Sequence, residues 1–361
     1  NDTVTSANLI VPKVGTGKFD FSVGGLAHTA DATGDTFALG LMPAGSNLTA
    51  TVQLPSSTLT AADLSLRLFE RRTSDRAVDL TNLTYATVPH HAVFDAIETA
   101  NAVTIEAWIY IRSWPQGYHT IFEKYEQTGD TGWTFAIQNG SGGISFWSSA
   151  TTRATADVTP SLNVWHHVAV AYDHAAGANA VRFYLDGALI ATKPSPGVLL
   201  NTDGEPAYIG FSPSGSDQYS DGPVSEIRLW NRALTTVEIQ TNYSATTLAG
   251  SESGLVGLWR FDEGSGLVGA DATASGNNAV LGGGDPARVP GWTTGSIRPL
   301  APVAGTSVSR AFSAEATAWL QLSAAANRGL SGRYYLSGNV TDSVSLQVVS
   351  TSLPAASGTT T

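Results

Sequence analysis

The strongest constraint on the fold is an alternation of apolar residues that stops at an Asp-Gly pair and then resumes. Val181, Phe183 and Leu185 occupy every second position, and Leu189 follows the pair at residues 186–187. Apolar side chains at every second position lie on one face of a β-strand. Asp-Gly between two such runs predicts a hairpin, because a type I′ turn requires positive φ at both of its central positions.

The same alternation recurs in residues 104–111, 133–137 and 168–172. In the first of these runs, Ile105 and its period-two neighbours form one face, while Trp108 belongs to the other. Large apolar groups on both faces predict a strand that is covered on both sides. These runs, separated by turn residues, predict an all-β chain built from antiparallel sandwiches.

One helix is expected within this β-rich sequence. Thr235 and Glu238 have the spacing of a capping box, in which each side chain satisfies a free backbone donor of the other residue. Val237, Ile239 and Tyr243 follow and are expected to pack against a sheet.

The charge of the chain bears on two classes of partner. The formal net charge is −11, and four of the 19 Lys and Arg residues are lysines. An acidic, lysine-poor surface disfavours nucleic acids and anionic membranes as partners. Because no apolar run approaches 18 residues, the sequence predicts no transmembrane segment.

Cysteine is absent, which excludes disulfides, thiolate metal sites and a cysteine nucleophile. Small secreted eukaryotic domains often carry disulfides, so their absence favours a prokaryotic source. The chain begins with Asn1-Asp2-Thr3. This start favours a mature secreted protein whose signal peptide has been removed, with a trimmed chain as the alternative. We therefore expect an extracellular or cell-surface location.

The turn-rich regions between the strand runs divide the chain into three predicted segments. Residues 1–80 form a small β-sandwich, residues 81–295 a larger one, and residues 296–361 a C-terminal β segment. The last segment is short for a sandwich, so it is expected to pair with the first segment or with a neighbouring subunit. The strands predicted outside the central segment are residues 19–23, 36–41, 48–54, 64–69, 316–322, 332–337 and 343–349.

Five stretches of the central segment resemble, in the family's order, laminin-G-like domains of the concanavalin A-like lectin/glucanase superfamily. They are residues 103–109, 165–173, 183–187, 226–239 and 258–278. The resemblance implies a concanavalin A-like antiparallel β-sandwich. The chain departs from the family at Ser225, where Asp is common, and in the loop of residues 271–278, which is one residue longer.

Residues 35–68 resemble, more loosely, the pre-peptidase C-terminal domains of secreted bacterial proteins. Those domains are small, non-catalytic β-sandwiches. In a recognition protein, we expect the segments that flank the central sandwich to act as spacers.

The carboxylates do not have the pattern of a glycosidase. Glucanases of this fold carry a Glu-x-Asp-x-x-Glu motif, which is absent here, and retaining enzymes need two carboxyl groups about 5–5.5 Å apart. Glu226 stands alone, while Asp262 and Glu263 are adjacent and point to opposite sides. A lyase cluster of Arg, Gln, His and Tyr is not evident either. We therefore expect no enzyme, with a glycoside hydrolase or polysaccharide lyase as the minor alternative.

The histidines do not form a metal-binding or nucleophilic motif. His166 and His167 follow Trp165 at the start of a predicted strand, where the resembled family has the same residues. A packing or capping role is expected for both.

The resemblance also implies Ca²⁺ at the rim of the sandwich. Calcium takes six to eight oxygen ligands, and we predict Asp262, Asp271 and Asn277 as ligands. Asp217 and Asp221 form a second acidic loop. The alternative is that these residues simply form turns.

Carbohydrate sites combine an exposed aromatic ring with a few polar groups. The aromatic candidates are Trp114, Tyr118, Trp147 and Tyr219, and each is as well explained by packing. The predicted function is a secreted, non-catalytic recognition protein that binds carbohydrate or a surface glycoconjugate, for example in cell adhesion.

The alternative function is structural. The chain would be a subunit of an extracellular fibre or surface layer, which self-associates by adding an edge strand or a terminus to the sheet of a neighbour.

Overall fold

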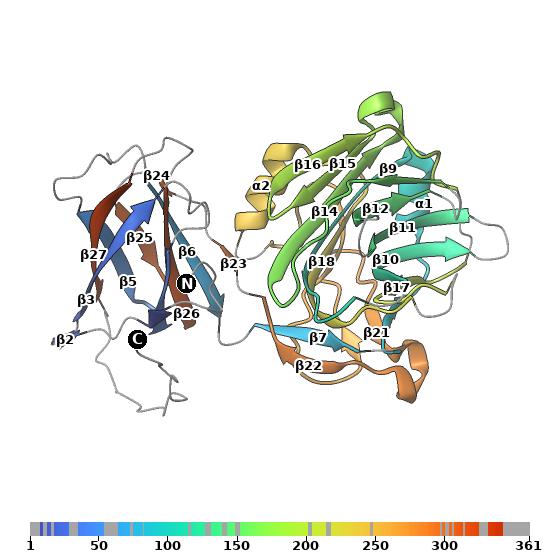
Figure 1. The fold of residues 1–361 in the computed structure, drawn as a ribbon. Helices are drawn as coiled ribbons and strands as arrows, with labels where there is room; N and C mark the ends of the chain where they lie inside the picture. The colour runs from blue at the N-terminus through green and yellow to red at the C-terminus, as the bar shows by residue number, and fades with distance from the viewer. Residues whose placement is uncertain are drawn as a thin grey trace. The chain divides into compact units, whose positions relative to one another are not determined.

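The chain folds into two units, each described by itself. The structure is a computed structural model that describes residues 8–9, 13–15, 18–28, 35–53, 64–72, 75–81, 83–114, 117–126, 131–138, 143–148, 152–200, 204–213, 218–245, 248–296, 298–299, 303–304, 307–312, 315–324 and 331–341. The terminal unit contains residues 1–72 and 302–361, and the central unit contains residues 73–301 (Figure 1).

The terminal unit contains two sheets. The first has the order β1 (Asn8–Leu9), β4 (Asp35–Met42), β26 (Ala316–Ala324) and β6 (Leu64–Arg72), and β24 (Val303–Ala304) also pairs with β6. The second has the order β2 (Lys13–Gly15), β3 (Lys18–His28), β27 (Ser331–Thr341), β5 (Asn47–Gln53) and β25 (Ser307–Ala311).

The C-terminal segment completes the sheets of the N-terminal segment within one chain. β26 lies between β4 and β6, and β27 lies between β3 and β5. The strand predicted over residues 343–349 lies outside the described residues. Self-association by strand addition stays a prediction.

The boundary of the first segment differs from the predicted position after residue 80. β7 (Arg76–Leu80) belongs to the central unit, because it pairs with β18 (Gly222–Trp230) and β22 (Gly291–Thr294). Both partners come from the central segment, and they bring the entry and the exit of the central unit together.

The central unit is built on two large sheets. Sheet I has the order β13 (Arg153–Thr155), β12 (Gly143–Trp147), β11 (Thr131–Gln138), β10 (Tyr118–Glu126), β17 (Ala207–Ile209), β8 (Ala86–Val88), β21 (Ala279–Leu281) and β20 (Val268–Gly269). Sheet II has the order β16 (Ala188–Lys193), β15 (Val181–Leu185), β14 (Trp165–Asp173), β9 (Ala102–Tyr110), β18, β7 and β22, and β19 (Leu255–Trp259) also pairs with β18.

The central unit also contains short helices and one further strand. They are α1 (Ala92–Ala100), α2 (Thr236–Ser244), three 3₁₀ helices (His174–Asn179, Gly282–Gly284 and Pro286–Arg288) and β23 (Arg298–Pro299). No helix among the described residues is long and apolar enough to cross a membrane.

The main core contains side chains from both sheets and from α1. Phe135 and Phe146 come from sheet I, Ile105 and Val170 from sheet II, and Phe94 from α1, and all are fully buried. These residues lie on the period-two faces of their strands, as the sequence predicts. This arrangement confirms the all-β class and the antiparallel sandwich.

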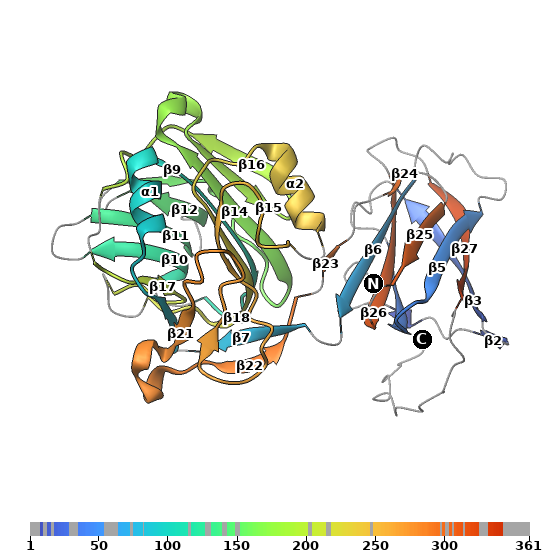
Figure 2. The same ribbon diagram turned by 180° about the vertical axis from the view of Figure 1, so that it is seen from behind.

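Sheet II is covered on its second face as well, which confirms the prediction for residues 104–111. Helix α2 lies against β14 and β15 on this face (Figures 1 and 2), where Ile239 joins a second buried cluster with Ala171 and Tyr184. Thr235 caps α2 in the predicted capping box with Glu238.

The expected packing of helix α2 was wrong at one of three positions. The Tyr243 ring stacks on Trp108 with a centroid distance of 5.6 Å, and Ile239 is buried. Val237 is 69% exposed. Ile239 is two positions after Val237, a step of more than half a turn of an α-helix, so the two side chains face opposite ways.

The Asp-Gly hairpin forms as predicted between β15 and β16. Asp186 and Gly187 both have positive φ, at 50° and 76°. Glycine is required at the second position for space as well, because a Cβ there would lie 2.7 Å from Tyr243 Cδ1. The turn therefore docks against the end of helix α2.

Candidate functional site

The outer face of sheet I carries an unbroken row of paired residues. Neighbours in this row are register partners, so the row crosses all eight strands. We call it the cross-strand row. Its members, from β13 to β20, are Arg153, Trp147, Thr134, Glu123, Tyr208, Thr87, Val280 and Val268.

A β-bulge places the carboxylate of the row on the outer face. Thr120 pairs with Ala136, but Phe122 pairs with Phe135, so Ile121 is the extra residue. Phe122 and Phe135 both lie in the core. Side chains alternate along a strand, so Glu123, the next residue, is directed away from the core. The bulge therefore decides which face carries the acid.

Glu123 lies at the centre of the row and is almost fully buried. Its Oε1 accepts a hydrogen bond of 2.8 Å from Ser212 Oγ. Burial raises the pKa of Glu123 to about 7, and hydrogen bonds from Ser212 and Thr134 offset part of that rise. Near neutral pH both protonation states are therefore populated, so the carboxyl can donate or accept a hydrogen bond.

On one side of Glu123, four half-buried aromatic rings form a cluster. Tyr208 belongs to the row, and its ring meets Phe211 edge-on at 5.6 Å. Phe211 also stacks on Tyr85 at 5.0 Å and on Tyr219 at 4.6 Å. Tyr219, a candidate from the sequence, therefore contributes to a continuous aromatic surface beside the acid.

On the other side of Glu123, two further candidates from the sequence meet. The rings of Tyr118 and Trp147 are perpendicular, with centroids 5.0 Å apart. The Arg153 guanidinium lies 5.8 Å from the Trp147 ring centroid and donates to Tyr118 and Gln138, each at 3.1 Å. The contacts fix the orientation of the indole at the exposed edge of sheet I.

The fourth aromatic candidate, Trp114, does not belong to this face. It is partly buried and packs against the main core. The structure thus brings Tyr118 and Trp147 together, places Tyr219 in the cluster across Glu123, and gives Trp114 a packing role.

The predicted calcium ligands are only partly brought together. Asp271 and Asn277 lie in one loop and are largely buried, whereas Asp262 is exposed. Asp271 Oδ1 accepts from the backbone N–H groups of Leu258 and Thr273, at 3.0 and 2.9 Å. Its Oδ2 accepts from Thr273 Oγ1 and from the Asn277 N–H, each at 3.0 Å.

These four bonds assign Asp271 a structural task, because a carboxylate offers about four lone-pair positions. Asn277 is also engaged, since its Nδ2 donates to Pro89 O at 2.9 Å. Among the described residues, no group of three His, Asp or Glu side chains could hold a metal ion. In the second acidic loop, Asp221 pairs with Arg112 at 3.0 Å, and Asp217 lies outside the described residues. Calcium binding stays a prediction.

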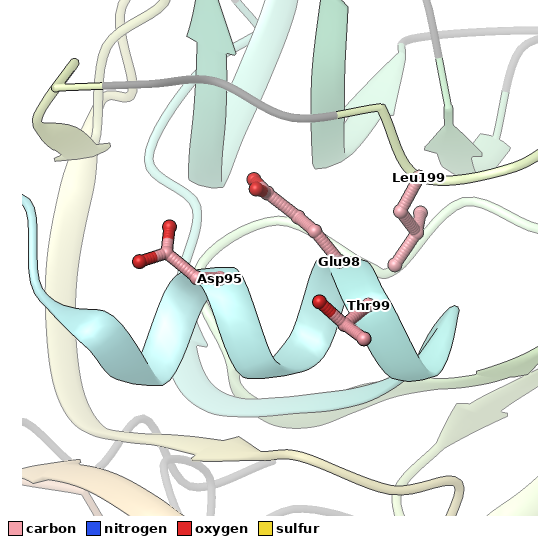
Figure 3. A pocket seen from close by; sticks show the side chains of 4 residues that line it. All are labelled: Asp95, Glu98, Thr99 and Leu199. Atoms are coloured by element: carbon pink, nitrogen blue, oxygen red, sulfur yellow. The ribbon is translucent and has the colours of Figure 1, made fainter.

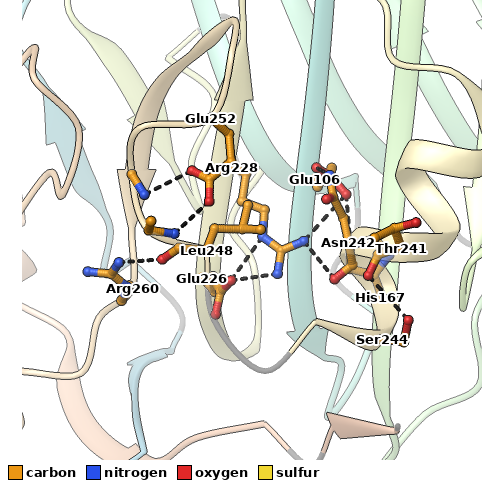
Figure 4. A network of polar contacts seen from close by, with 12 residues as sticks. Glu106, His167, Glu226, Arg228, Thr241, Asn242, Ser244, Leu248, Glu252 and Arg260 are labelled. Atoms are coloured by element: carbon orange, nitrogen blue, oxygen red, sulfur yellow. Dashed lines mark hydrogen bonds and ion pairs between the residues drawn. The ribbon is translucent and has the colours of Figure 1, made fainter. Parts of the chain in front are cut away.

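A second polar cluster lies between sheet II and helix α2 (Figure 4). Arg228 donates to Glu226 Oε1 from Nε at 2.9 Å, and Glu106 accepts from Asn242 at 2.8 Å. His167 Nε2 lies 3.3 Å from Glu106 Oε2. Glu106, Arg228 and His167 have no exposed surface, so the cluster has no access for a ligand. It also confirms the packing role expected for His167.

A small pocket of about 210 Å³ lies beside helix α1, between Asp95, Glu98, Thr99 and Leu199 (Figure 3). Figure 3 shows the carboxyl groups of Asp95 and Glu98 on the same side of the helix. The volume is below the range of about 300–1,000 Å³ that is usual for small-molecule sites. The pocket is therefore a weaker candidate than the cross-strand row.

Comparisons with known proteins concern the same central part of the chain. Residues 80–240 match the family model of the concanavalin A-like lectin/glucanases superfamily. A search of curated proteins gave no match. The resemblance of residues 35–68 to pre-peptidase C-terminal domains stays a prediction.

Three solved structures are similar to the chain at low identity. A candidate carbohydrate binding protein from Bacteroides ovatus ATCC 8483 is 13% identical, with 82% of this chain and 98% of that chain covered and a TM-score of 0.48. A heptameric SAP-like pentraxin from Limulus polyphemus is 16% identical, with 62% and 97% covered and a TM-score of 0.37.

The third is domain 4 of AbnA, a GH43 extracellular arabinanase from Geobacillus stearothermophilus, in complex with arabinotriose. It is 19% identical, with 39% of this chain and 66% of that chain covered and a TM-score of 0.32. The family match rests on the sequence itself, and the two-sheet sandwich agrees with it. The chain is therefore similar in sequence to the concanavalin A-like lectin/glucanase superfamily over residues 80–240.

Proposed function

We propose that the central unit binds carbohydrate along the cross-strand row and does not cleave glycosidic bonds. The observation that carries this proposal is the position of Glu123 between Trp147 and Tyr208 in one row of register partners. Sugars combine apolar ring faces with hydroxyl groups. A site that alternates aromatic rings with a carboxyl group is complementary to both features.

The width of the row supports a ligand larger than one sugar. Trp147 and Tyr208 are separated by three inter-strand steps, through Thr134 and Glu123. At about 4.8 Å per step, their backbones lie about 14 Å apart. A short oligosaccharide could contact both aromatic residues and pass over Thr134 and the largely buried Glu123 between them.

The presence of a single carboxyl group in the row supports binding without cleavage. Retaining and inverting glycosidases both need a pair of carboxyl groups that flank the scissile bond. Glu123 is the one Asp or Glu among the eight residues of the row. The proposal includes action outside the cell, where lectin-like domains commonly meet glycans.

Titration calorimetry on oligosaccharides chosen from a glycan array tests this function. Trp147→Ala and Tyr208→Ala should each weaken binding about fivefold or more, since loss of a stacking ring costs on the order of 1 kcal/mol. Trp165→Ala is the matched control, because Trp165 is similarly half-buried but belongs to sheet II. An array without ligands, or equal losses in all three variants, would argue against the cross-strand row as the site.

A further inference from the structure

Three side chains at one end of sheet II form a continuous hydrogen-bonded relay. Ser161 Oγ lies 2.8 Å from His166 Nε2, and His166 Nδ1 lies 2.8 Å from Asp186 Oδ2. Ser161 precedes β14, His166 is the second residue of β14, and Asp186 opens the turn between β15 and β16. The relay therefore joins a loop, a strand and a hairpin that are held together by the pairing of β14 with β15.

For the neutral imidazole of His166, the two partners determine the direction of each hydrogen bond. A carboxylate can only accept, so the bond to Asp186 places the imidazole proton on Nδ1. Nε2 then carries a lone pair, and the Ser161 hydroxyl donates to it. This is the polarity in which a histidine acts as general base toward a serine nucleophile.

The surroundings hold the acid and the imidazole in place. The other oxygen of Asp186, Oδ1, accepts from the His167 N–H at 3.0 Å, and the Asp186 N–H donates to His167 O at 2.8 Å. The side chain and the backbone N–H of Asp186 are thus both bonded to His167, which stabilises the positive φ of Asp186. His166 is 8% exposed, whereas Ser161 is exposed, so a sheltered base faces an accessible hydroxyl.

We propose that Ser161, His166 and Asp186 form an acyl-transfer site for carboxylic esters, with Ser161 as the nucleophile. Ser161 Oγ bonds to the ester carbonyl carbon while its proton moves to His166 Nε2. The ester C–O bond then breaks, and that proton passes to the departing alkoxide. Water attacks the acyl-serine with His166 as base, which releases the acid and restores the serine.

The turn around Ser161 limits the expected rate. The Asn163 N–H, two residues after the nucleophile, already donates to Ile111 O at 2.8 Å. It is therefore not available to stabilise an oxyanion, and loss of one such donor typically costs about 10²–10³ in rate. We expect slow turnover that is measurable with activated esters. The site is independent of the proposed carbohydrate binding, which concerns sheet I.

Labelling of the full chain with a fluorophosphonate probe, together with hydrolysis of 4-nitrophenyl acetate, tests the proposal. The phosphonyl group should map to Ser161 by peptide mass spectrometry. Ser161→Ala and His166→Gln should each lower the labelling and hydrolysis rates at least about 100-fold, the lower range for general-base assistance. Asp186→Asn should lower them as well, because it removes the group that sets the tautomer.

Ser195→Ala is the matched control. Ser195 Oγ lies 2.9 Å from a histidine nitrogen, His174 Nδ1, and the variant should keep the full labelling rate. If His166→Gln or Asp186→Asn fails to fold, Ser161→Ala still decides, because its side chain lies in an exposed turn. Absence of a label on the folded wild-type chain, a label on another residue, or unchanged rates in Ser161→Ala would each overturn the proposal.

Discussion

The indole N–H of Trp230 donates a 2.8 Å hydrogen bond to Glu106 Oε1, although the two residues are 124 positions apart in the sequence. Glu106 Oε1 also accepts from Asn242 Nδ2, and Oε2 lies 3.5 Å from Arg228 NH1. One carboxylate thus connects β9, β18 and α2. Burial alone would raise the pKa of Glu106, but Arg228 and His167 outweigh it and hold the pKa below its ordinary value.

Replacement of this carboxylate should destabilise the central unit strongly. Glu106→Leu leaves the Trp230 indole N–H and Asn242 Nδ2 without their acceptor in a fully buried cluster. It also removes one of the two carboxylates beside Arg228, which keeps its bonds to Glu226 and to Asn242 O. Removing one partner of a buried pair typically costs about 3–5 kcal/mol, and we expect a loss of that size in the free energy of unfolding. Urea denaturation at pH 7 measures it.

The control for this variant is Asp262→Asn, which changes an exposed carboxylate. Surface substitutions of this kind usually change stability by less than about 0.5 kcal/mol. A loss below about 1 kcal/mol in Glu106→Leu would show that water or a neighbouring group replaces the carboxylate.

Glu123 should give the central unit a pH dependence of the opposite sign to that of an ion-paired acid. Its pKa rises from 4.5 to about 7 on folding. Between these values the folded state binds more protons than the unfolded state, so stability falls as pH rises. The shift corresponds to a decrease of about 3 kcal/mol in the free energy of unfolding between pH 4.5 and pH 7.

Glu123→Gln removes this contribution, because an amide resembles the protonated acid and does not titrate. We expect the variant to gain stability relative to the wild type as pH rises from 5 to 8. Urea denaturation at several pH values measures the difference between the two curves. Parallel curves for the two proteins would contradict the raised pKa.

In the cross-strand row, the core face of a strand could be predicted from the sequence, whereas the position of the acid could not. The alternation of Trp133, Phe135 and Ile137 predicts the core face of β11, and the structure confirms it. The bulge at Ile121 has no local signal, since residues 118–126 contain no glycine or proline. The face occupied by Glu123 depends on this one extra residue, so the acid could not be assigned in advance.

The candidate residues depended on contacts between distant parts of the chain. Tyr118 and Trp147 could be proposed as aromatic candidates, but their contact depends on the register of β11, the strand between β10 and β12. Ser161 and Asp186 are 25 positions apart, and they meet at His166 only because β14 pairs with β15. Residue types suggest chemistry, whereas strand register decides which of them meet.

The turn after β15 should tolerate no side chain at Gly187. Gly187→Ala adds a Cβ that would lie 2.7 Å from Tyr243 Cδ1, at a φ of +76°. A left-handed conformation costs a non-glycine residue about 1–3 kcal/mol, and displacement of the Tyr243 ring adds to that cost. Thermal and urea denaturation should both show the loss.

Gly204→Ala separates the two contributions to this loss. Gly204 has a similar φ of +78°, with nothing within 4 Å of the added Cβ. We expect Gly187→Ala to be destabilised more than Gly204→Ala by about 1 kcal/mol or more. Equal losses would mean that the Tyr243 ring moves aside freely.

A substitution at Asp271 distinguishes a structural role of its loop from calcium binding. Asp271→Asn places an amide NH₂ against donors that the carboxylate now accepts from, such as Thr273 Oγ1 and the Asn277 N–H. Buried donors without an acceptor cost about 1–3 kcal/mol each, and the variant should lose at least that much stability.

A turn-closing role predicts the same loss in chelator and in millimolar calcium, with Asp262→Asn unaffected in both. If calcium binds here, it stabilises the wild type by mass action and leaves Asp271→Asn unchanged, so the loss would grow with calcium concentration.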